Sequence, residues 1–110
     1  MNDDKIFITS ATRTAVATIG KALKNISADK LGSCVIDNLL KKSNVNPDEI
    51  DEIIMGQVLT GGVGQNPARQ AAVRSGIPKE KPAFVVNQVC GSGIRSIVSG
   101  YQSIKSKDSK

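Results

Sequence analysis

A cysteine follows an apolar run and precedes two closely spaced glycines in the stretch VVNQVCGSGIRSI, residues 85–97. Cysteine is nucleophilic as the thiolate, and the partial positive charge at the start of a helix favours that form. Gly91 and Gly93 leave space beside the sulfur for a bulky acyl group, and they let backbone amides approach a developing oxyanion. If the following helix begins early, the thiol points along its apolar stripe into a pocket. Cys90 is therefore a candidate nucleophile.

These residues alone leave a second interpretation open. A free cysteine is often a small buried apolar residue, and neighbouring glycines often serve only a tight turn. Cys34 falls mid-helix on an apolar face, which favours a packing role. The chain contains no histidine, so it lacks the usual ligands of zinc and haem sites and has no imidazole to act as a general base.

The elements that must position Cys90 alternate between strand and helix. Short apolar runs at residues 6–8, 53–59 and 83–86 predict three strands. A helix is expected after each strand: one capped by Ser27, one that starts at Pro67 and stops before Gly76, and one along residues 94–104. The order β-α-β-α-β-α predicts an α/β fold with a mainly parallel sheet and helices on both of its faces. Ligands of such sheets bind beyond the carboxyl ends of the strands, where Cys90 is expected.

Composition excludes several classes of function. The net charge is +5, but the chain has three aromatic residues and no dense basic cluster, so we expect a solvated surface and no nucleic-acid site. No apolar run is long enough to span a membrane, and the acidic start differs from a secretory signal. We therefore expect a cytoplasmic protein that forms one domain. The GGVGQN segment matches neither a dinucleotide fingerprint nor a P-loop, which disfavours a phosphate binder.

Longer segments resemble the thiolases, the family of acetyl-CoA C-acetyltransferase and 3-ketoacyl-CoA thiolase. The segment NQVCGSGIRSI, residues 87–97, is similar to the nucleophile motif of that family. Four further segments resemble the start of a thiolase in the same order: ITSATRTAV, ADKLG, IIMGQVLTGGVGQNPARQAAVRSGIP and PAFVVNQVCGSG.

The resemblance implies that Cys90 is the catalytic residue that accepts an acyl group as a thioester, with its own backbone amide as an oxyanion donor. Coenzyme A thioesters are the implied substrates, with no separate cofactor and a role in fatty acid metabolism. Thiolases are oligomers, and the resemblance implies that six residues lie near a two-fold dimer contact, although helix and loop capping explains them equally well: Gly64, Gln65, Asn66, Arg69, Asn87 and Gln88.

Thiolases are several times longer than this chain. Their catalytic histidine and second cysteine lie in a carboxyl-terminal half, and Cys34 does not match the motif of that cysteine. We therefore expect residues 1–110 to be an incomplete thiolase N-terminal domain within a three-layer fold, inactive without the missing portion. The alternative is a non-catalytic remnant or assembly module that retains the dimer surface. In either case we expect an exposed sheet edge, a partly covered third helix and marginal stability.

Overall fold

The computed structural model describes residues 5–110 and has an α/β architecture. Helix α1 (Ala28–Ser43) is followed by a 3₁₀ turn η1 (Pro47–Glu49), strand β1 (Ile53–Gly56), helix α2 (Pro67–Arg74), strand β2 (Ala83–Val86) and helix α3 (Ser92–Lys105). The two strands pair in parallel, with Ile53 opposite Ala83 and Gly56 opposite Val86. The expected parallel pairing with helical crossovers is confirmed.

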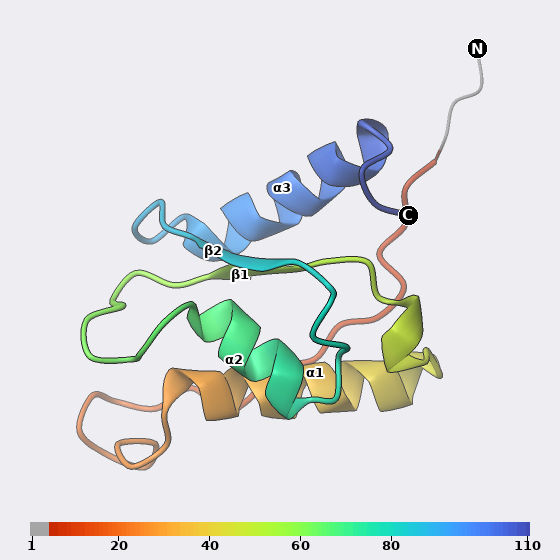
Figure 1. The fold of residues 1–110 in the computed structure, drawn as a ribbon. Helices are drawn as coiled ribbons and strands as arrows, with labels where there is room; N and C mark the ends of the chain where they lie inside the picture. Colours follow the sequence, from red (N-terminus) through yellow and green to blue (C-terminus); the bar gives the residue numbers. More distant parts are fainter. Residues whose placement is uncertain (1–4) are drawn as a thin grey trace.

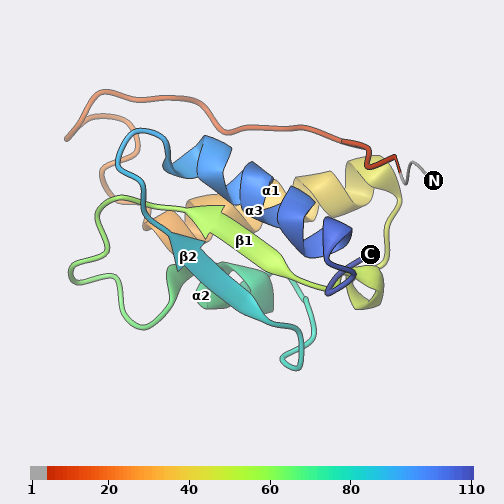
Figure 2. The same cartoon turned by 90° about the horizontal axis from the view of Figure 1, so that it is seen from above.

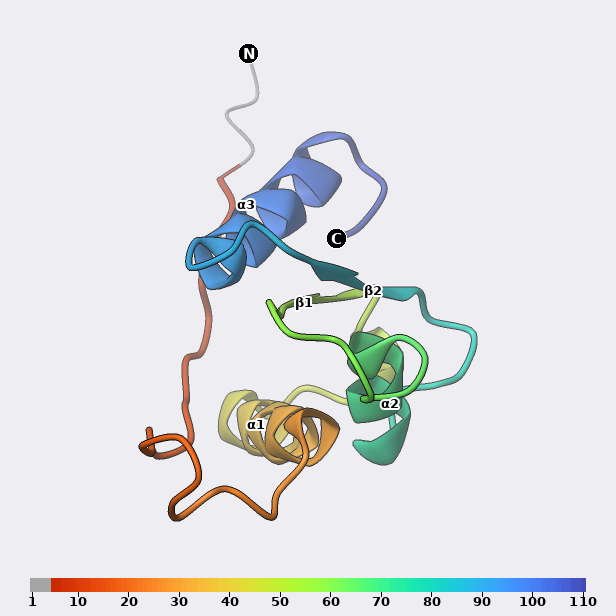
Figure 3. The same cartoon turned by 90° about the vertical axis from the view of Figure 1, so that its left-hand side faces the viewer.

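Helices cover both faces of the sheet (Figures 1 and 3). Helix α3 lies on one face, and α1 and α2 lie on the other. Helix α2 packs against both the sheet and α1. This arrangement places the amino end of α3 at the carboxyl end of the parallel strands.

The prediction of a strand at residues 6–8 is wrong. This segment is irregular, and the side chains of Phe7 and Ile8 are exposed. It runs along the β1 side of the molecule but apart from the sheet (Figure 2). A strand needs a neighbouring backbone to pair its amides and carbonyls, and no described residue pairs with this segment. The irregular chain just after it is attached to α1 by a hydrogen bond of 2.9 Å from Lys42 Nζ to the carbonyl of Ala11.

The second predicted strand is shorter than expected. It ends at Gly56, although the apolar pattern continues to Leu59. The amide of Gln57 donates to the carbonyl of Val86 at 3.1 Å and makes the last ladder contact. Strand β2 ends at Val86, so Val58 and Leu59 have no strand backbone beside them, and both side chains are exposed.

The core between α1, α2 and the sheet consists of small side chains. Among the described residues, the buried hydrophobic ones are Ala68, Ala71, Ala72 and Ile77. A Cβ at Gly32 of α1 would lie 3.1 Å from the Cβ of Ala71, so the two helix backbones approach closely here. Close approach of small residues makes a tight helix pair, but it removes little apolar surface from water.

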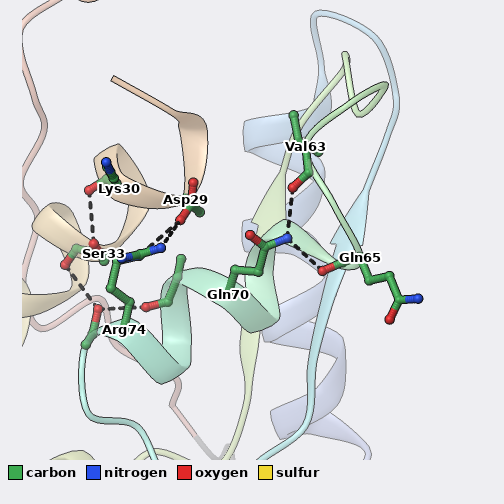
Figure 4. A network of polar contacts seen from close by, with 9 residues as sticks. Asp29, Lys30, Ser33, Val63, Gln65, Gln70 and Arg74 are labelled. Carbon is green, nitrogen blue, oxygen red and sulfur yellow. Dashed lines mark hydrogen bonds and ion pairs between the residues drawn. The ribbon is translucent and has the colours of Figure 1, made fainter. Parts of the chain in front are cut away.

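One ion pair joins the start of α1 to the end of α2 (Figure 4). The Arg74 guanidinium contacts Asp29 Oδ2 through two nitrogens, at 2.8 Å and 3.0 Å. A hydrogen bond from the Ser27 hydroxyl lowers the pKa of the Asp29 carboxyl below its ordinary value, burial works against it, and Arg74 lowers it further. Asp29 is also favourably placed in the first turn of a helix, where a negative charge offsets the positive end of the dipole.

The far end of α3 is tied back to the start of β1. The Ser103 hydroxyl donates to the Glu52 carboxylate at 2.9 Å, and the backbone amide of Lys110 donates to that of Asp51 at 2.9 Å. In contrast, the apolar face of α3 is open: Ile94 is 70% exposed, Ile97 58% and Tyr101 51%. No other described part of the chain lies over this face, which confirms the expectation of an incompletely covered third helix.

Candidate active site

Cys90 lies in a short connection between β2 and α3, which we call the Cys90 turn (residues 87–91). Helix α3 begins at Ser92 with Gly91 as its N-cap, so the cysteine precedes the helix by two residues. The predicted joint of strand, cysteine turn and helix is confirmed. The thiol, however, is exposed. The expectation of a pocket on a buried stripe is wrong because the apolar face of α3 is itself open.

Hydrogen bonds to the side chain of Ser92 hold the Cys90 turn in shape. The Ser92 hydroxyl donates to the carbonyl of Val89 at 2.6 Å and accepts the amide of Gln88 at 2.9 Å. Ser92 is only 4% exposed, so water competes little for these bonds. One buried hydroxyl therefore fixes the backbone on the amino side of Cys90.

A second polar side chain connects the turn to the loop after β1. Asn87 donates from Nδ2 to the carbonyl of Val58 at 3.1 Å, and its Oδ1 accepts the amide of Val89 at 2.9 Å. The Cys90 turn is thus attached to the chain on both sides, through Asn87 to the β1 loop and through Ser92 to the helix.

The left-handed residue of the turn is Val89, with φ of 50°. Its branched side chain makes this conformation costly, and such residues persist only where the surroundings impose them. Gly91 has an ordinary φ of −85°, so the glycine does not supply the sharp bend. One of the two interpretations of the sequence gave the neighbouring glycines the role of making a tight turn, whereas the left-handed residue lies one position before the cysteine.

The amino end of α3 keeps its partial positive charge. Gly91 offers no capping side chain, and the first turn contains no acidic residue. The amides of Gly91 and Ser92 donate to the carbonyls of Gln88 and Val89, at 3.0 Å and 3.1 Å, so the attraction for negative charge comes from the dipole of the helix. A thiolate or an oxyanion at Cys90 would therefore lie beside a region of favourable potential.

Most of the residues implied for a dimer contact take part in hydrogen bonds within the chain. Asn66 Oδ1 accepts the amide of Arg69 and caps α2, and Arg69 donates to the carbonyl of Lys81 at 3.1 Å. Gln70, which the sequence did not single out, donates to the carbonyls of Val63 and Gln65 and holds the glycine-rich loop (Figure 4). These bonds fit the capping interpretation, and a role of Gly64, Gln65, Asn66, Arg69, Asn87 or Gln88 in a dimer stays a prediction.

The second cysteine belongs to another part of the molecule. Cys34 lies on α1, on the opposite face of the sheet from α3 (Figure 1). Its side chain is exposed, so the expected packing role is wrong. The two thiols occupy separate surfaces, which makes Cys34 a useful internal reference for Cys90.

Within residues 5–110, no cluster of three metal-ligating side chains could hold an ion. No helix in this part of the chain is long and apolar enough to cross a membrane.

Comparison with known proteins identifies the family. The model of the thiolase N-terminal domain matches residues 6–110. An acetyl-CoA acetyltransferase of Rhizobium meliloti is 47% identical over the whole chain, which spans 28% of its length. A probable acetyl-CoA acyltransferase of Staphylococcus aureus strain NCTC 8325 is 48% identical over 91% of the chain, which spans 25% of its length. With the family model covering nearly every residue, including the strand, turn and helix around Cys90, the chain belongs to the thiolase family.

Proposed function

We propose that this chain takes part in thiolase-type acyl transfer, in which Cys90 accepts the acyl group of an acyl-CoA as a thioester. The observation that carries the proposal is the exposed thiol at the amino end of α3, where no side chain caps the helix and the first turn holds no acidic residue. The names of the relatives support acetyl-CoA as the first substrate to test.

The proposed step exchanges one thioester for another. The Cys90 sulfur attacks the carbonyl carbon of the acyl-CoA, and the carbonyl oxygen becomes an oxyanion. The new carbon–sulfur bond remains when the bond to the coenzyme A sulfur breaks, and coenzyme A leaves with the proton that the cysteine has lost. In this proposal the backbone amide of Cys90 and the amino end of α3 stabilise the oxyanion. A second acyl-CoA carbanion, or coenzyme A itself, then removes the acyl group.

A general base is required to take the cysteine proton, and histidine is the side chain most often used for this task. The sequence has no histidine. We propose that the base comes from outside residues 1–110, as the resemblance to longer thiolases implies. Loss of a general base costs on the order of 100-fold to 10,000-fold in rate. We therefore expect no turnover by the 110-residue chain alone, only slow acylation of Cys90.

Mass spectrometry after incubation with acetyl-CoA tests the proposal. We expect one acetyl group on the peptide that contains Cys90, cleavable by hydroxylamine as a thioester is. The Cys34→Ser variant should keep this adduct and the Cys90→Ser variant should lose it. Acetyl groups on both cysteines at equal rates, or only on lysines, would show that the Cys90 site gives no special reactivity.

The second candidate function is a non-catalytic assembly module. The exposed apolar side chains of α3 favour it, because a continuous apolar face commonly marks a protein contact. This candidate predicts association with a thiolase-family chain and no acetyl adduct on Cys90 at any acetyl-CoA concentration. Sedimentation velocity together with the acetylation assay separates the two functions.

A further inference from the structure

The carboxyl end of β1 touches the first turn of α3 backbone to backbone. A Cβ placed on Gly56 would lie 2.4 Å from the carbonyl carbon of Ser92 and 2.7 Å from the amide nitrogen of Gly93. Ordinary contacts of a Cβ begin at 3.4 Å. Any side chain at position 56 would therefore push the helix start away from the strand by about 1 Å, since the neighbouring atoms are rigid backbone.

The glycine is required here for space and not for conformation. Gly56 is absent from the glycines with positive φ, so its backbone angle suits other residues. A glycine inside a strand often marks the close approach of another backbone. By contrast, a Cβ at Gly93 or at Gly100, both in α3, would meet no atom within 4 Å. The tight contact is confined to the point where the strand meets the helix start.

Ser92 connects this contact to the cysteine. Its carbonyl faces Gly56, while its hydroxyl bonds the backbone of Gln88 and Val89. A displacement of Ser92 therefore carries the Cys90 turn with it or breaks these bonds.

We propose that Gly56 is a positioning residue for Cys90. By letting β1 abut the first turn of α3, it sets where the helix start and the Ser92 hydroxyl lie, and through them the location of the thiol. The inference rests on the proposed function only in assigning an acyl-accepting role to Cys90; the effect on the thiol is measurable without acyl transfer.

The test compares alkylation of the two cysteines by iodoacetamide in the folded 110-residue chain. Rates at Cys90 and Cys34 are followed by peptide mass spectrometry in the wild type, Gly56→Ala and Gly100→Ala. We expect Gly56→Ala to slow Cys90 by roughly fivefold or more, because the thiol moves from the helix end. The rate at Cys34 should stay within about twofold of the wild type, and Gly100→Ala should leave both rates unchanged.

The ratio of the alkylation rate at Cys90 to that at Cys34 separates an effect on the position of the thiol from an effect on the stability of the chain. Both thiols are already exposed in the folded chain, so loss of stability alone would not selectively slow Cys90. Ser92→Ala is the second variant, since it cuts the connection to the turn without adding an atom, and it should also slow Cys90 selectively. The inference is overturned if folded Gly56→Ala keeps the wild-type ratio of the alkylation rates at Cys90 and Cys34. If Gly56→Ala does not fold, an unchanged ratio in Ser92→Ala overturns it instead. If the ratio changes but acetyl-CoA never acylates the wild type, the proposed function fails while the positioning role stands.

Discussion

At the scale of single residues, the left-handed conformation of Val89 is a cost that the rest of the turn has to offset. Val89 is 64% exposed, so its side chain gains little from burial in return. The bonds from Asn87 and Ser92 to its backbone impose the conformation. A left-handed angle costs a branched residue roughly 1–2 kcal/mol.

Val89→Asn should therefore stabilise the chain, because asparagine adopts positive φ more easily than valine. We expect the free energy of unfolding to rise by about 1 kcal/mol in urea denaturation. The matched control is Val16→Asn, an exposed coil position outside the positive-φ set, which should change stability little. Equal effects of the two variants would indicate that Val89 is not strained.

Sequence reasoning singled out Cys90 as a candidate but did not single out Gly56 and Ser92, for a physical reason. A cysteine beside glycines at a strand–helix joint has a local signature. The role of Gly56 depends on which strand end meets which helix start, a relation between segments 36 positions apart (92 minus 56) that no local pattern encodes. The available signal was weak: a glycine at the end of the apolar run Ile53–Gly56.

At the scale of elements, the Asp29–Arg74 ion pair joins the start of α1 to the end of α2. The folded state lowers the pKa of Asp29, with Ser27 as the first cause and Arg74 contributing, so folding favours the ionised carboxyl. Its stabilising contribution is complete above the ordinary value of 3.8 and is lost as the pH falls through the lower folded value.

Asp29→Asn should accordingly destabilise the chain at pH 7 by roughly 1 kcal/mol, since Arg74 is half-exposed and the solvent screens the pair. The difference from the wild type should shrink below pH 3.8, where the wild-type carboxyl also becomes neutral. Asp37→Asn, in the same helix but without an ion pair among the described residues, should show neither effect. Thermal melts at a series of pH values make the comparison.

The sequence predicted all three helices and two of the strands, since periodicity and capping are local properties. Asn66 and Pro67 start α2 as expected. The prediction of a strand at residues 6–8 failed because strand formation depends on a partner backbone, and hydrophobic periodicity does not show whether one is present. The end of β1 was misplaced for the same reason, because β2 turns away at Asn87.

At the scale of the whole molecule, the described chain is elongated and has a small core. Its radius of gyration is 14.4 Å, against about 13 Å for a compact domain of 100 residues. The buried apolar side chains among residues 5–110 are three alanines and one isoleucine. With so little apolar surface removed from water, we expect marginal stability.

The open face of α3 should make the chain associate with itself. Ile94→Gln combined with Ile97→Gln should weaken association in sedimentation velocity, with little effect on the unfolding midpoint because both side chains are largely exposed. The control removes similar surface from the coil through Val16→Gln and Ile19→Gln, both also exposed. A wild-type chain that stays monomeric at high concentration and melts sharply would contradict both expectations.

Helix α3 is held near both of its ends, by the hydrogen bond of Ser103 to Glu52 just before β1 and by the backbone contact of Ser92 with Gly56 at the end of β1. Because both ends are held, α3 cannot shift along β1 as a rigid body. If Cys90 accepts an acyl group as proposed, any movement of its sulfur should come from the five residues of the Cys90 turn, in which Val89 holds the strained φ dihedral angle.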